Sequence, residues 1–105
     1  LEIALKPSLQ DTLILKYFLD SSKEKKYYLG EVFALNQLGT IYQDDSFFDK
    51  AITLHQKALA VADLMANPVL KINSLNMLSL AYLRKNAIQS ALDNTQLAST
   101  HPSIE

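Results

Sequence analysis

The strongest constraint on this chain is a signature that occurs twice, 40 residues apart. The segment Leu-Asn-Gln-Leu-Gly-Thr-Ile-Tyr at 35–42 lines up with Leu-Asn-Met-Leu-Ser-Leu-Ala-Tyr at 75–82. The register continues downstream through three further matched pairs, which are Ala51 with Ala91, Gln56 with Gln96, and Ala58 with Ala98. A fixed period of this size is typical of repeat architectures, in which each unit buries its apolar face against its neighbours. The period therefore predicts the fold and the kind of surface presented, but not what binds to that surface.

Composition narrows the class of protein further. The chain has 105 residues, the length of one domain, and 49% of them are apolar, which supplies a core and excludes disorder. Two glycines and three prolines are few, which favours long helices over a turn-rich β fold. The net charge of −1 provides no broad field for nucleic acid or an anionic membrane. No apolar run approaches the roughly 18–20 residues that span a bilayer.

The sequence also contains no cysteine, so it has no disulfide framework and no thiolate chemistry. That composition leans toward a reducing compartment, and we expect a cytoplasmic location. Because the chain begins with Leu1 and shows no signal-peptide pattern, we interpret it as a segment excised from a larger protein.

Apolar residues at three- and four-residue spacing predict about five helices joined by short turns. Their expected bounds are about 8–20, 23–44, 47–66, 68–84 and 87–98. The expected helix-starting caps are Ser22 for the second helix, Asp45 or Ser46 for the third, and Asn67, followed by Pro68, for the fourth. Lys85 and Asn86 are expected to form the turn before the fifth helix. Such short loops make consecutive helices antiparallel neighbours.

The matched residues resemble the signature of the tetratricopeptide repeat (TPR) family. The first copy carries Leu38, Gly39, Tyr42, Ala51 and Ala58, and the second keeps Leu78, Tyr82, Ala91 and Ala98 with Ser79 in place of the glycine. The resemblance implies an all-α fold, a single domain over 1–105 in which antiparallel helix pairs stack as a right-handed solenoid. Repeat 1 would cover about 24–66 and repeat 2 about 67–99. The helix at 8–20 would be a remnant of a preceding repeat, although it lacks the small-residue marks.

The 40-residue period is longer than the commoner 34 and is similar to a subgroup found in kinesin light chains, cell-polarity scaffold proteins and bacterial peptide-sensing regulators. The resemblance implies a non-catalytic module of a regulatory or signalling protein, with a protein or an extended peptide as its partner. In that subgroup the first helix of each pair lines a concave groove, and an asparagine there often hydrogen-bonds the backbone of a peptide. Asn36 and Asn76 match that position. The implied peptide-binding set is Asn36, Thr40, Gln43, Asn73, Asn76, Leu80, Leu83 and Arg84.

Each of these assignments has a plainer alternative. An amide can grip a peptide bond without reading sequence, but Asn36 and Asn76 can equally be solvated or bonded within their helices. Leu80 and Leu83 can anchor a ligand side chain, or they can meet a neighbouring repeat or a second copy. Arg84 can pair with a ligand carboxylate or with nothing specific.

For the whole module, the alternative function is a structural or dimerisation arm that transmits a signal to an attached effector domain. A homodimer of this kind would use apolar surface on the terminal helices near Leu13, Tyr17 or Leu97.

Other chemistry is not indicated by the sequence. Asp44, Asp45 and Asp49 form an acidic cluster, but their spacing fits no calcium loop and favours helix capping, so no metal site is expected. His55 is expected to be a packing residue. No nucleophile–base–acid set and no glycine-rich phosphate loop is visible, so we expect no catalytic residue, no cofactor and no enzyme activity.

One basic and aromatic segment resembles a nucleic-acid-binding patch, and it consists of Lys23–Lys26, Tyr27 and Tyr28. Glu24 and Glu31 dilute its charge, and a solvated helix start explains it better. Neither nucleic acid nor a membrane is expected as a partner.

Overall fold

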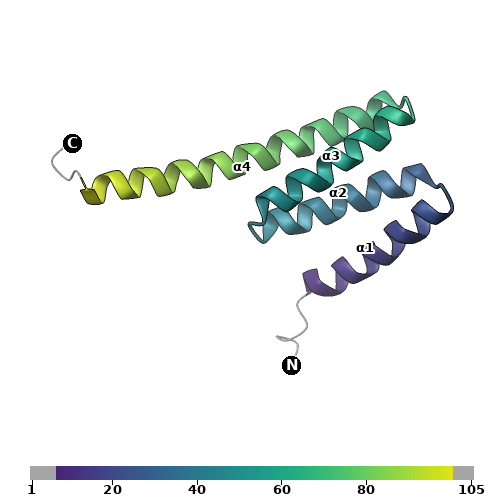
Figure 1. Cartoon of the computed structure of the whole chain (residues 1–105), viewed down its shortest axis with the longest axis horizontal. Coiled ribbons are helices and arrows are strands. Elements are labelled where there is room, and N and C mark those ends of the chain that lie inside the picture. The colour runs from purple at the N-terminus through teal and green to yellow at the C-terminus, as the bar shows by residue number, and fades with distance from the viewer. Residues whose placement is uncertain (1–6, 101–105) are drawn as a thin grey trace.

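The computed structural model describes the backbone of residues 7–100 and the side chains of 11–90, 92 and 93. Four helices follow one another in this part of the chain, namely α1 (Pro7–Glu24), α2 (Tyr28–Asp44), α3 (Phe48–Leu64) and α4 (Pro68–Thr100), and it contains no strand. Successive helices reverse direction and lie side by side in chain order (Figure 1). The predicted all-α fold of stacked antiparallel helix pairs is confirmed.

Three turns of one design join the helices. In each, the residue after the helix cap has a positive φ, with values of 56° at Lys26, 69° at Ser46 and 55° at Ala66. Backbone N–H groups just beyond each helix then bond back to its last turn, as in the 2.7 Å bond from Tyr27 to the carbonyl of Ser22. This is the Schellman arrangement, which satisfies carbonyls at a helix end that otherwise lack partners.

The turns correct two of the expected caps. α1 continues to Glu24 and α2 begins only at Tyr28, so Ser22 lies inside α1 instead of capping the second helix. The residue preceding α3 is Phe47, and it makes no side-chain capping bond, so neither Asp45 nor Ser46 is the cap. The physical reason is that the Schellman turn uses these positions to end the preceding helix. Asn67 was predicted correctly, because its Oδ1 accepts a 3.1 Å bond from the N–H of Leu70.

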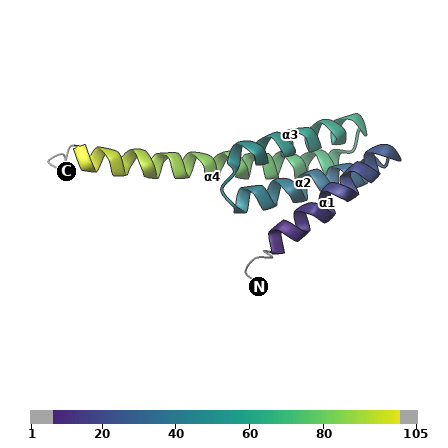
Figure 2. The ribbon, with the colours of Figure 1, turned by 60° about the horizontal axis from the view of Figure 1, so that its bottom comes forward.

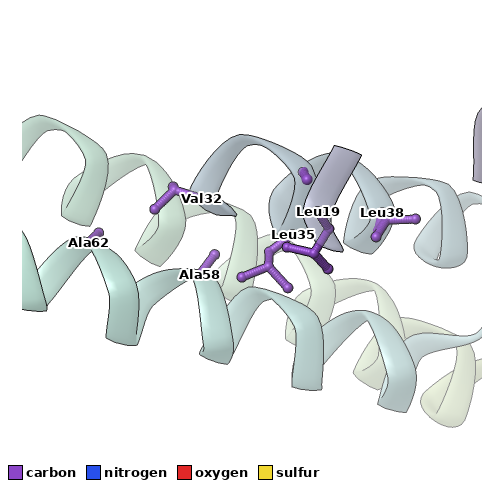
Figure 3. Packing of buried hydrophobic residues seen from close by; sticks show 7 residues of the cluster. Leu19, Val32, Leu35, Leu38, Ala58 and Ala62 are labelled. Atoms are coloured by element: carbon purple, nitrogen blue, oxygen red, sulfur yellow. The ribbon is translucent and has the colours of Figure 1, made fainter. Parts of the chain in front are cut away.

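The core lies where α1, α2 and α3 meet. Leu19 from α1, Leu35 and Leu38 from α2, and Ala58 and Ala62 from α3 belong to one buried cluster (Figure 3). The alanines let α3 approach α2 closely, which is why large residues lie on one helix and small ones on the other.

The fifth helix is not a separate element. α4 is a single helix of 33 residues, and the turn predicted at Lys85 and Asn86 is absent. Its second half runs on past the ends of α2 and α3 (Figures 1 and 2). Backbone hydrogen bonding therefore continues through the segment where the sequence predicts a break.

Candidate peptide-binding groove

A cavity of about 650 Å³ opens between α1, α2 and the first half of α4. Its lining residues are Phe18, Tyr27, Leu29, Gly30, Val32, Phe33, Asn36, Gln37, Leu70, Asn73, Asn76 and Met77. We call this cavity the groove. Its walls are mostly apolar and aromatic, and its only polar side chains besides the Tyr27 hydroxyl are amides. A groove of this size and composition suits an uncharged segment of a partner better than a charged one.

α1 and α2 form one end of the groove because they approach each other closely. Gly30 makes that approach possible, since a Cβ there would lie 2.5 Å from Ser22 Oγ and 2.6 Å from the Tyr27 ring. Phe18 of α1 and Phe33 of α2 meet edge to face with ring centroids 6.3 Å apart. Phe33 remains 53% exposed, so its ring is available at the groove surface.

Asn36 lies at the floor of the groove and has a different role from the one expected. It is buried, its Nδ2 donates a 3.0 Å bond to Ser74 Oγ of α4, and its Oδ1 lies 2.9 Å from His55 Nδ1 of α3. One amide thus ties three helices together. Asn36 therefore does not present a fully free amide to a ligand, because its acceptor oxygen and one of its donor hydrogens already have protein partners.

His55 completes this buried network. Because the Asn36 oxygen can only accept, His55 Nδ1 carries the proton and donates it, and in the neutral ring Nε2 is then the unprotonated nitrogen. Nε2 is buried and has no hydrogen-bond partner among the described residues. Burial lowers the pKa of His55, since a charged ring would lose its hydration. The predicted packing role of His55 agrees with this position.

Gly39 is required by the same ring. A Cβ on Gly39 would lie 2.6 Å from His55 Cε1 and 2.7 Å from Nε2. The ring occupies the space that a side chain would take, so the small residue of the signature serves to seat the histidine.

The family comparison agrees with this geometry. A family profile described as tetratricopeptide repeat matches residues 31–99. The chain belongs to the tetratricopeptide repeat family. Searches of curated proteins and of solved structures each gave no match. TPR units are protein-interaction modules and are generally non-catalytic, which supports the predicted role in protein interaction. The long-period subgroup stays a prediction.

The TPR signature residues of the first repeat occupy the buried positions that the pattern implies. Leu38, Gly39, Ala51 and Ala58 are buried, and Tyr42 is half-buried. In the second repeat Leu78 is half-buried and Tyr82 is 41% exposed. The side chains of Ala91 and Ala98 lie outside the described residues.

The remaining predicted binding residues divide between two places. Asn73 and Asn76 are exposed and line the groove. Leu80 and Leu83 are exposed farther along α4, outside the groove lining. Arg84 also lies outside the groove lining, and its guanidinium is 3.6 Å from the carboxylate of Asp44, so its charge already has a partner.

Two further predicted residues lie on α2, where Thr40 is half-buried and Gln43 is buried. Thr40 donates a 3.0 Å bond to the carbonyl of Asn36, and Gln43 is buried with its Oε1 lacking a partner among the described residues. Neither belongs to the groove lining. The structure therefore brings together Asn36, Asn73 and Asn76 from the predicted set, and separates the others from them.

No sequence pattern marked most of the apolar lining of the groove. Phe18 and Tyr27 come from α1 and its turn, which carry no repeat signature, so no motif marked them. Leu70 and Met77 were missed because α4 carries apolar residues on several faces. The sequence did offer one indication that Phe33 lines the groove, because Phe33 occupies on α2 the position that Asn73 occupies on α4.

The charged residues serve the fold in ways that the sequence did not identify. Asp49 lies in the first turn of α3 and accepts a 2.7 Å bond from Lys85 of α4. Within residues 7–100 no group of three potential metal ligands occurs, and no helix there is long and apolar enough to cross a membrane.

Proposed function

We propose that the chain is a non-catalytic module that binds an extended peptide segment of a partner protein in the groove, as part of a larger regulatory or signalling protein. The observation that carries this proposal is the composition of the groove, which combines apolar walls with the exposed amides of Asn73 and Asn76 and contains no charged lining residue.

The two amides are suited to hold a peptide backbone. Asn73 and Asn76 are three residues apart on α4, so their side chains lie on the same face of the helix. Each offers two donors and an acceptor, which matches the alternating groups of an extended chain. Their bonds would be independent of ligand sequence, so specificity would come from the walls.

Phe33, Leu70 and Met77 supply walls for a bulky apolar side chain of the ligand. Exposed aromatic residues at the centre of an interface commonly contribute most of its binding free energy. The absence of lysine and arginine from the lining argues against a carboxylate-rich ligand.

The test begins with peptide display against the wild-type chain, followed by fluorescence anisotropy of an enriched peptide. Phe33→Asp and Asn76→Ala change exposed groove residues, and Thr53→Asp changes an exposed residue on α3 outside the groove lining. We expect Phe33→Asp to weaken binding at least about tenfold, since a charge would be desolvated in the complex. Thr53→Asp should leave affinity unchanged. Equal affinity for all four proteins would refute binding in the groove.

One observation favours the second candidate function, a dimerisation arm. Leu13, Ile14 and Tyr17 on the outer face of α1 are 60%, 65% and 77% exposed. A second copy packing on this face would bury them. Light scattering over a concentration series checks this, since a constant monomer mass would exclude the arm and a dimer that Tyr17→Glu dissociates would support it.

A further inference from the structure

The turns between the helices recur every 20 residues, and α4 continues as a helix through the next position of that series. The positive-φ residues are Lys26, Ser46 and Ala66, at a constant spacing of 20 residues, and the next position in the series is Asn86. α2 and α3 each have 17 residues, whereas α4 has 33 and continues through Asn86. After glycine, asparagine is the residue that most readily adopts the left-handed conformation. The fourth position therefore has a better residue for such a turn than the three that form one.

The first half of α4 carries a mostly apolar stripe that the described part of the chain leaves largely exposed. We define the α4 stripe as Ile72, Leu75, Ser79 and Tyr82, which match Val32, Leu35, Gly39 and Tyr42 in the 40-residue register. On α2, Val32 and Leu35 are 1% and 2% exposed in a cluster with two alanines of α3. On α4, Ile72 and Leu75 are 57% and 41% exposed. The difference is that α3 packs on α2, while the described residues leave the stripe largely exposed, and at its end Gln56 of α3 donates a 3.5 Å bond to the Tyr82 hydroxyl.

The second half of α4 carries the complementary surface. Ile88 and Leu92 match Phe48 and Ile52 of α3, which are half-buried and buried respectively. On α4 they are 50% and 60% exposed. One chain therefore contains both a surface like that of α2 and a segment like α3, held apart by a continuous helix.

We propose that the α4 stripe is a docking face for residues 88–99 of the same chain, which reach it when α4 opens into a turn with Asn86 in the left-handed conformation. α4 then has two states, the continuous helix and a helical hairpin that repeats the packing of α2 on α3. This inference concerns a different face from the groove and does not rest on the proposed function.

The same chain is a better occupant of the stripe than a second copy. The segment 85–87 has the same length as the turns 25–27, 45–47 and 65–67, so the hairpin needs no longer connection. A tethered segment also has a high effective concentration at its docking face. The ion pairs of Arg84 and Lys85 at the junction are exposed, and such pairs hold little free energy against opening.

Distances between spin labels test the proposal, and the cysteine-free sequence allows clean labelling. Asn73→Cys with Asp93→Cys places two labels 20 residues apart on exposed positions. In a straight helix these positions are about 30 Å apart. The matched reference is Phe33→Cys with Thr53→Cys, the same positions one repeat earlier, which report the distance across the α2–α3 hairpin.

We expect the 73/93 pair to show a short-distance population that coincides with the reference, beside the one near 30 Å. Asn86→Gly should enlarge the short population and Asn86→Ala should shrink it, with about a tenfold change in the ratio between the two variants. The reference distance should not change in either background, which checks that the fold is intact.

Two results would overturn the proposal. One is a single population near 30 Å in all three proteins, including Asn86→Gly. The other is a short distance that disappears when the labelled protein is diluted into unlabelled protein, because that distance would join two copies.

Discussion

The buried amide of Asn36 gives the sharpest stability prediction, because the repeat supplies its own control. Asn36→Ala removes the partners of His55 Nδ1 and Ser74 Oγ, leaving two buried polar groups unsatisfied. Asn76 occupies the matching position one repeat later, where it is exposed and makes no side-chain hydrogen bond with another described residue. The same substitution should therefore have very different consequences at the two sites.

The magnitude follows from the cost of stranding buried groups. Each buried donor or acceptor left without a partner costs about 1–3 kcal/mol, so two of them cost about 2–6 kcal/mol. Ser74 lies in a helix, and its hydroxyl can turn to a carbonyl of its own helix, which brings the sum to about 3 kcal/mol. A domain of this size is stable by about 5–15 kcal/mol, so the loss is a large fraction of the total. Asn76→Ala should change stability by less than about 0.5 kcal/mol.

Urea unfolding followed by circular dichroism at 222 nm measures both values. With a slope of about 2 kcal/mol per molar urea, Asn36→Ala should lower the midpoint by about 1.5 M. Ser74→Ala, alone and combined with Asn36→Ala, then gives a coupling free energy, expected at about 0.5–3 kcal/mol. Midpoints that agree for Asn36→Ala and Asn76→Ala, together with zero coupling to Ser74, would refute the role assigned to the network.

Three further predictions follow from neighbouring contacts. Because burial lowers the pKa of His55 in the folded protein, the unfolded chain takes up a proton at this residue at a higher pH than the folded chain does. Stability should therefore fall as the pH drops below about 6.5. His55→Gln should flatten that dependence in urea titrations between about pH 5.5 and 8. Gly39→Ala should destabilise the protein by about 1–3 kcal/mol, because the new methyl group would contact the His55 ring and outweigh the helix-propensity gain of about 1 kcal/mol. Ser79→Ala, at the exposed matching position, should be neutral or stabilising in the same assay. Asn67→Ala should cost about 1 kcal/mol through loss of the α4 cap, and an unchanged melting temperature would contradict this.

The sequence predicted the fold well because the information there is local and repeated. The period placed α2 and α3 within a few residues, and Asn67 with Pro68 marked the start of α4. The predicted caps before α2 and α3 were wrong because Schellman turns occupy these positions. These turns place Lys26 and Ser46 in the left-handed conformation, as the next turn does Ala66, although glycine or asparagine is favoured there. Tertiary packing of the helices outweighs the cost of these conformations.

The candidate site was less predictable, since a groove depends on which helices meet. Asn73 and Asn76, which line the groove, were among the predicted residues because the resemblance implied that the first helix of each pair lines a concave surface. The wall formed by Phe18 and Tyr27 belongs to α1, which carries no signature, so its contribution depends on a contact between segments that sequence periodicity does not mark.

The contrast between Asn36 and Asn76 shows how a repeat position acquires its role. The two residues share a motif, a helix position and a register, but α3 and α4 supply partners to Asn36, while no described element supplies them to Asn76. In a stacked array a polar side chain becomes structural when the next helix covers it and stays available for a ligand when none does. Predicting one ligand-binding asparagine in each repeat from the sequence therefore overstates the number of free amides. It is the uncovered amide of α4, together with Asn73 beside it, that would hold the peptide in the proposed function.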